Sequence, residues 1–152
     1  MKTRSITLLA ALGLLISGSA FAAKSLEKIT CPVSKKPVKE EHAVAYKEAS
    51  VYFCCPNCPK AFTKDTAKFA AKANHQLVAT KQAKQIACPL SGQKTVDSTA
   101  VKIAGTEVKF CCEKCQGKVA KAKDDEQITL AFNDKAFEKA FKVDVDDDDD
   151  DN

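Results

Sequence analysis

The feature that most constrains this chain is a repeat in its cysteines. A shift of 57 residues superimposes every cysteine on another one, and none of the eight is left over. The pairs are Cys31 with Cys88, Cys54 with Cys111, Cys55 with Cys112, and Cys58 with Cys115. A fixed period of this kind is the signature of a duplicated structural unit. We therefore predict two tandem copies of one small module, over residues 24–80 and 81–142.

Within each copy the apolar pattern changes from period two to period 3.6 at the cysteine cluster. Alternating apolar residues flank Gly105-Thr106 in the second copy and residues 48–50 in the first, which predicts a β-hairpin in each. Residues 57–64 and 113–123, after the clusters, have helical patterns. Each module is thus predicted to contain a Cys-Pro knuckle, a β-hairpin and a helix, an α+β fold.

The two copies are predicted to end differently. In the first, a longer helix over 65–79 has Asp65 as its cap and an apolar stripe at every fourth residue, and residues 80–87 form a linker. In the second, residues 127–132 have a strand-like composition. A short helix over 134–141 comes after them, so the second module carries an extra C-terminal strand and helix.

The cysteine spacing predicts a metal site in each copy. A knuckle cysteine and two cysteines at the start of a helix can converge on one soft cation, and the helix N-terminus favours their thiolate form. Thiolates suit Zn²⁺ or Cu⁺, so we expect one such ion per module. A three-thiolate set leaves a position open or filled by an auxiliary ligand, Cys55 or Cys112. The candidate ligands are Cys31, Cys54, Cys55, Cys58, Cys88, Cys111, Cys112 and Cys115.

Two other interpretations of the cysteines stay open. The N-terminal residues, described below, predict export, and cysteines of exported proteins are usually oxidised. The eight cysteines could therefore form disulfides that stabilise a structural or interaction protein, although a disulfide between adjacent cysteines would be strained. The Cys-x-x-Cys pairs could instead serve a thiol-disulfide oxidoreductase, but no βαβ pattern surrounds them. Neither His42 nor His75 has a counterpart in the second copy, so we expect both on the surface and outside the shared site.

The two cysteine-containing segments resemble a known family. The strings CPVSKKPV…AVAYKEASVYFCCPNCPKAF and CPLSGQKTV…AVKIAGTEVKFCCEKCQGKV are similar to YHS domains, and their cysteine spacing resembles the TRASH motif. The likeness covers residues 29–70 and 86–121. It implies treble-clef-like modules and a role in heavy-metal sensing, trafficking or resistance, with another metal-handling protein as a possible partner.

The first 22 residues have the three parts of an export signal. Lys2 and Arg4 precede an apolar run over 8–16, and a small-x-small cleavage site comes next at 20–22. We expect a periplasmic or secreted protein. The run is shorter than the roughly 20 residues that span a bilayer, and no later segment replaces it, so no transmembrane segment is expected in the mature chain.

The charge distribution and the missing motifs exclude several functions. Residues 23–143 contain 22 lysines against 13 acidic residues, but no arginine and no aromatic platform, so we expect no nucleic-acid partner. Residues 143–152 are an acidic tail, predicted to be disordered. With no Ser/His/Asp set, paired carboxylates or phosphate loop in view, we expect metal binding without catalysis.

Overall fold

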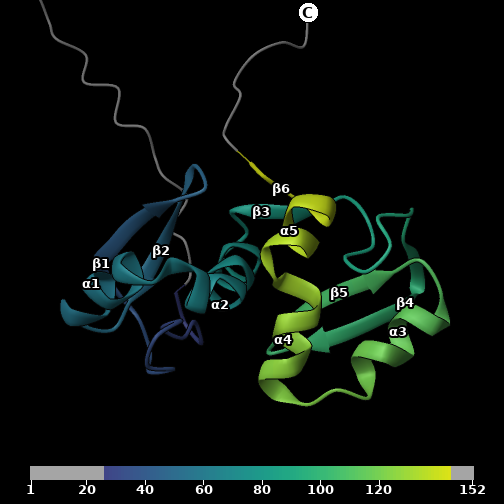
Figure 1. The fold of residues 1–152 in the computed structure, drawn as a ribbon, viewed down its shortest axis with the longest axis horizontal. Helices are drawn as coiled ribbons and strands as arrows, with labels where there is room; N and C mark the ends of the chain where they lie inside the picture. Colours follow the sequence, from purple (N-terminus) through teal and green to yellow (C-terminus); the bar gives the residue numbers. More distant parts are fainter. Residues whose placement is uncertain (1–25, 145–152) are drawn as a thin grey trace, which may run out of the picture.

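The computed structural model describes residues 26–144, so the predictions for the signal peptide and for the tail beyond Asp144 lie outside the described residues. Within this range the chain forms five helices and three two-stranded antiparallel sheets (Figure 1). The α+β prediction is confirmed at this level, and the treble-clef assignment stays a prediction. No helix in residues 26–144 is long and apolar enough to cross a membrane.

The first half has the predicted order of elements. A hairpin of β1 (Lys39–Tyr46) and β2 (Ala49–Phe53) leads into α1 (Asn57–Lys64) and α2 (Thr66–Ala79). The turn residues Lys47 and Glu48 both have positive φ, at 49° and 61°, which is typical of a type I′ hairpin turn. The Asp65 side chain accepts a hydrogen bond from the backbone N–H of Lys68 and caps α2, as predicted.

The second half repeats the hairpin, but its C-terminal elements differ from the prediction. β4 (Val96–Ile103) and β5 (Thr106–Phe110) lead into α3 (Glu113–Ala120), α4 (Asp124–Phe132) and α5 (Asp134–Ala140). The strand predicted over 127–132 is wrong, because these residues belong to α4. Three acidic residues in its first turn favour a helix start, and its last residues, Ala131 and Phe132, are fully buried. This packing overrides the strand-like composition.

The predicted linker contains a strand that joins the two halves. β3 (Ala83–Gln85) pairs antiparallel with β6 (Phe141–Val143), which lies one repeat further along the chain. In this ladder Lys84 pairs with Lys142 and Gln85 with Phe141. By the shift of 57 residues, Lys84 is equivalent to Phe141 and Gln85 is equivalent to Lys142. Exchanging equivalent positions therefore turns the first of these two pairs into the second. Such a register is that of a local twofold axis between the halves.

The helices pack around the same axis. His75 of α2 lies edge-to-face against Phe132 of α4, with ring centroids 5.0 Å apart, and these two positions are also related by the shift of 57. Nε2 of His75 lies 3.1 Å from the Thr106 hydroxyl of the second hairpin. His75 is therefore half-buried at the contact between the two halves, and not fully exposed as predicted.

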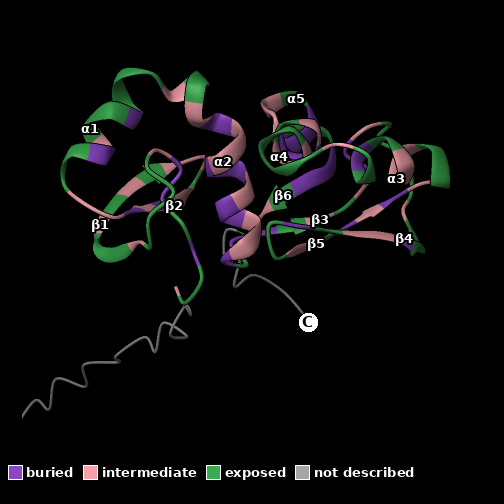
Figure 2. Ribbon diagram, turned by 90° about the horizontal axis from the view of Figure 1, so that it is seen from below, coloured by how far each residue is buried: buried purple, intermediate pink, exposed green. Residues whose placement is uncertain are grey.

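A single hydrophobic core extends through both halves. Its buried positions include faces of α2 and α4, which meet between the two hairpins (Figure 2). From the apolar stripe predicted for α2, Ala73 and Leu77 are fully buried. From the hairpins, Phe53 and Phe110, which precede the cysteine pairs, are fully buried as well. The core thus anchors the strands that carry the cysteines.

Candidate metal centres

The structure brings three cysteine sulfurs together in each half. The sulfurs of Cys31, Cys54 and Cys58 all lie within 4.8 Å of one another, and so do those of Cys88, Cys111 and Cys115. Each of these two groups, called triads below, could hold a metal ion. Each takes one sulfur from the knuckle, one from the end of a strand and one from the first turn of a helix. Neither histidine belongs to a triad.

Backbone hydrogen bonds fix the knuckle cysteine in the same way twice. The N–H of Cys31 donates to Lys36 O at 2.8 Å, and the N–H of Lys35 donates to Cys31 O at 2.8 Å. The second knuckle repeats both bonds around Cys88, at 2.9 and 2.7 Å. Lys35 and Gly92 occupy the same left-handed turn position, with φ of 61° and 77°. The repeat of this turn explains why both knuckle sulfurs face their triads alike.

A buried glutamine on α2 ties two ligand-bearing segments of the first triad together. The Gln76 side chain accepts from the N–H of Tyr52 at 2.6 Å and donates to Tyr52 O at 2.9 Å. It also donates to Thr30 O at 3.1 Å. Thr30 directly precedes Cys31, and Tyr52 lies two residues before Cys54. Gln76 therefore holds the knuckle against the strand.

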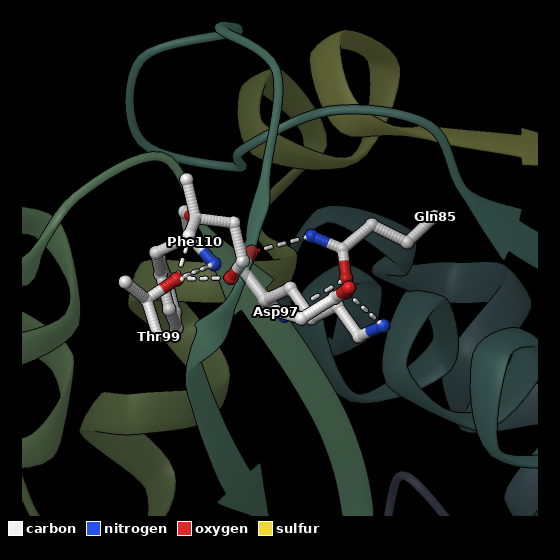
Figure 3. Close-up of polar contacts among 6 residues, drawn as sticks. Gln85, Asp97, Thr99 and Phe110 are labelled. Carbon is white, nitrogen blue, oxygen red and sulfur yellow. Dashed lines mark hydrogen bonds and ion pairs between the residues drawn. The ribbon is translucent and has the colours of Figure 1, made fainter.

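A second glutamine does the same for the other triad, although it comes from a different element. Gln85 of β3 accepts from the N–H of Lys109 at 3.0 Å and donates to Lys109 O at 2.6 Å (Figure 3). It also donates to Ala87 O at 2.8 Å. Ala87 and Lys109 are the repeat equivalents of the residues that Gln76 holds. The Thr99 hydroxyl further braces the end of β5 through the N–H and carbonyl of Phe110.

Sequence reasoning missed both glutamines. The shift of 57 places Asn133 opposite Gln76 and Lys28 opposite Gln85, so the repeat contains no signal for either. Residue type did not indicate that these side chains are inside the protein either, since glutamine is mostly exposed in proteins. Gln76 is only 2% exposed.

Hydrogen bonds around the triads favour negative charge on the knuckle sulfur. Burial tends to raise the pKa of Cys31, but hydrogen bonds from the Ser34 hydroxyl and from nearby backbone N–H groups outweigh it and lower the pKa. The same balance, with Ser91, lowers the pKa of Cys88 to about 7. Burial and hydrogen bonds to the other thiols raise the pKa of Cys58 and of Cys115 to about 12. A bound cation would have to displace these last protons.

Cys55 and Cys112, the predicted auxiliary ligands, lie beside the triads but are not members of them. The Cys55 sulfur is 3.4 Å from that of Cys58, whereas the Cys112 sulfur is 3.6 Å from that of Cys111. Hydrogen bonding to the Cys58 thiol, followed by nearby backbone N–H groups, lowers the pKa of Cys55 to about 7. Hydrogen bonds from the Cys115 backbone N–H and from the thiols of Cys111 and Cys115 likewise lower the pKa of Cys112, so each auxiliary cysteine contacts the same two members of its triad.

The first knuckle also contacts the other half of the molecule. Asp125 of α4 forms ion pairs with Lys35 at 2.8 Å and with Lys72 at 3.1 Å. A cavity of about 280 Å³ beside Cys31 is lined by these three side chains and by His75. At the second knuckle the turn is crowded, because a Cβ at Gly92 would lie 3.0 Å from the Lys139 side chain. Lysine and glycine at this turn position thus reflect different surroundings.

Comparisons of the chain with protein-family models, with curated proteins and with solved structures give no significant match.

Proposed function

We propose that this chain is an exported protein that binds one soft metal ion, Zn²⁺ or Cu⁺, at each triad and serves in metal trafficking, sensing or resistance. The observation that carries the proposal is the repeated geometry of the triads. Two sets of three sulfurs lie within 4.8 Å, one set per half. Thiolates at such separations can share one ion with bonds of about 2.3 Å.

The sulfur geometry favours metal binding over disulfide stapling. All eight cysteines are free, and in the triads the sulfurs of Cys54 and Cys58 lie 3.7 Å apart, as do those of Cys111 and Cys115. Each triad has an odd number of sulfurs, so disulfides alone would leave one of the three unpaired or recruit the adjacent cysteine. A single cation uses all three at once.

One observation favours a second candidate, a thiol-disulfide role for the Cys-x-x-Cys pairs. Cys55 and Cys58 form a Cys-x-x-Cys pair with sulfurs 3.4 Å apart, and the pKa of Cys55 is lowered to about 7. A low pKa and access to solvent are the usual marks of a reactive thiol. In the second half, hydrogen bonds from the Cys115 backbone N–H and from the thiols of Cys111 and Cys115 also lower the pKa of Cys112, so the equivalent pair shares this character.

Native mass spectrometry with elemental analysis, on protein taken from its own compartment, tests the proposal. We expect two metal equivalents per chain. After chelation, titration with an alkylating reagent is expected to find eight free thiols. A metal content of zero with all cysteines in disulfides would refute metal binding, and alkylation of Cys55 and Cys112 well ahead of the other thiols in metal-free protein would favour the redox candidate.

A further inference from the structure

A serine hydroxyl touches the triad in both halves. Ser34 Oγ lies 3.0 Å from Cys54 Sγ, and the Ser91 hydroxyl donates a hydrogen bond to Cys111 Sγ at 3.1 Å. The two serines are repeat equivalents. Each also hydrogen-bonds the knuckle cysteine of its own triad. The hydroxyl therefore stands next to two of the three sulfurs in each site.

The backbone orients this hydroxyl toward sulfur. The N–H of Lys36 donates to Ser34 Oγ at 3.4 Å, and the N–H of Gln93 donates to Ser91 Oγ at 3.2 Å. These bonds use a lone pair of each serine oxygen and leave the hydroxyl proton available. A metal-bound thiolate has no proton to give, so the serine must be the donor in the loaded site. Outer hydrogen bonds of this type orient a ligand and tune the metal.

The Ser34 and Ser91 hydroxyls are neutral, so they contact the triads without adding negative charge to the three thiolates. Structural zinc sites are almost always tetrahedral, with four cysteine or histidine ligands. Soft thiolates also select Cu⁺. Three thiolates carry a net charge of −2 around Cu⁺ but only −1 around Zn²⁺. A hydroxyl that donates to sulfur stabilises the more negative of these two complexes more strongly.

We propose that Ser34 and Ser91 determine the metal specificity of the two sites, holding the thiolates of Cys54 and Cys111 by hydrogen bonds and favouring Cu⁺ over Zn²⁺. They are positioning residues that act through the cysteine ligands. This proposal rests on the proposed function, because it assumes that each triad binds a metal ion.

The test uses the full chain from residue 23, reduced and free of oxygen, with Ser34→Ala, Ser34→Thr and Ser34→Cys. Cu⁺ affinity is measured against a chromogenic Cu⁺ chelator, and Co²⁺ serves as a spectroscopic substitute for Zn²⁺. The second triad is unchanged in all three variants and provides an internal control. If Ser34→Ala disturbs folding, Ser91→Ala tests the equivalent serine-to-sulfur hydrogen bond at the other triad.

We expect Ser34→Ala to weaken one of the two Cu⁺ equivalents by about 10–100-fold, the range typical of lost outer-shell partners, and Ser34→Thr to retain the affinity. Ser34→Cys should raise the Co²⁺ affinity of that site and strengthen its sulfur-to-cobalt absorption, as a fourth thiolate joins the metal. Unchanged Cu⁺ binding in Ser34→Ala and Ser91→Ala would overturn the proposal, as would a wild-type preference for Co²⁺ and Zn²⁺ over Cu⁺. If the wild-type chain binds neither metal, the proposed function itself fails.

Discussion

Replacing Gln76 by alanine would release the strand and the knuckle that carry two ligands of the first triad. The change removes three hydrogen bonds, to the N–H and carbonyl of Tyr52 and to the carbonyl of Thr30. At about 1 kcal/mol for each bond, the free energy of unfolding falls by about 3 kcal/mol. If metal binding must restore the lost geometry, affinity at the first triad falls by up to roughly 100-fold, since each 1.4 kcal/mol is tenfold.

Gln82, between α2 and β3, offers a matched control because it holds the other end of the same hairpin. Its side chain is also buried and also makes three hydrogen bonds, to the N–H and carbonyl of Ser50 and to the Thr80 hydroxyl. Ser50 lies at the turn end of β2, away from the cysteines. Gln82→Ala should therefore cost a similar unfolding free energy without moving the metal ligands.

Urea unfolding of the reduced, metal-free chain measures the stability of both variants, and competition against a chelator measures their metal affinity. We expect similar losses of stability from the two changes. Only Gln76→Ala should weaken one metal equivalent, while the second equivalent stays at wild-type affinity. Equal loss of metal affinity in both variants would refute the positioning argument, because general loosening of the hairpin would then explain the effect.

Four further outcomes are expected. Cys58→Ser should lose one metal equivalent and loosen the first half, whereas Cys55→Ser should keep both equivalents, as counted by native mass spectrometry. Burial lowers the pKa of His75 below its usual 6.5, so the unfolded chain takes up this proton first and stability should fall as the pH drops below about 6.5. His75→Phe should flatten that dependence in urea unfolding at about pH 7.5 and about pH 5.5. Asp125→Asn should cost less than about 1 kcal/mol, because its ion pairs are half-exposed, and the difference from wild type should vanish at high salt. Removing residues 145–152 should leave the melting temperature and metal affinity unchanged, since a run of like charges stays solvated.

The repeat and the periodicity of the sequence were enough to predict most of the local elements. Both hairpins, the helices after the cysteine clusters and the Asp65 cap arise from local patterns, and the structure confirms them. Residues 127–132 were misassigned because a short apolar run is compatible with strand or helix, and burial against the other half decides between them.

The contacts between distant segments could not be predicted in this way. Gln76 and Gln85 hold equivalent backbone groups from positions that are not equivalent, so comparison of the two copies hides them. The pairing of β3 with β6 depends on two three-residue strands, too short to give a periodic signal. Burial of His75 likewise results from the packing of α2 on α4, which no local pattern contains.

The symmetric register of β3 and β6 gives this single chain the arrangement of a symmetric dimer whose two halves are joined covalently. Two separate subunits would part on dilution, but here the partner is always present at a high effective concentration set by the connecting chain. The tether also lifts a restriction on sequence. A side chain on the axis of a homodimer must pack against a copy of itself. In this chain the two equivalent positions can differ, and His75 packs against Phe132.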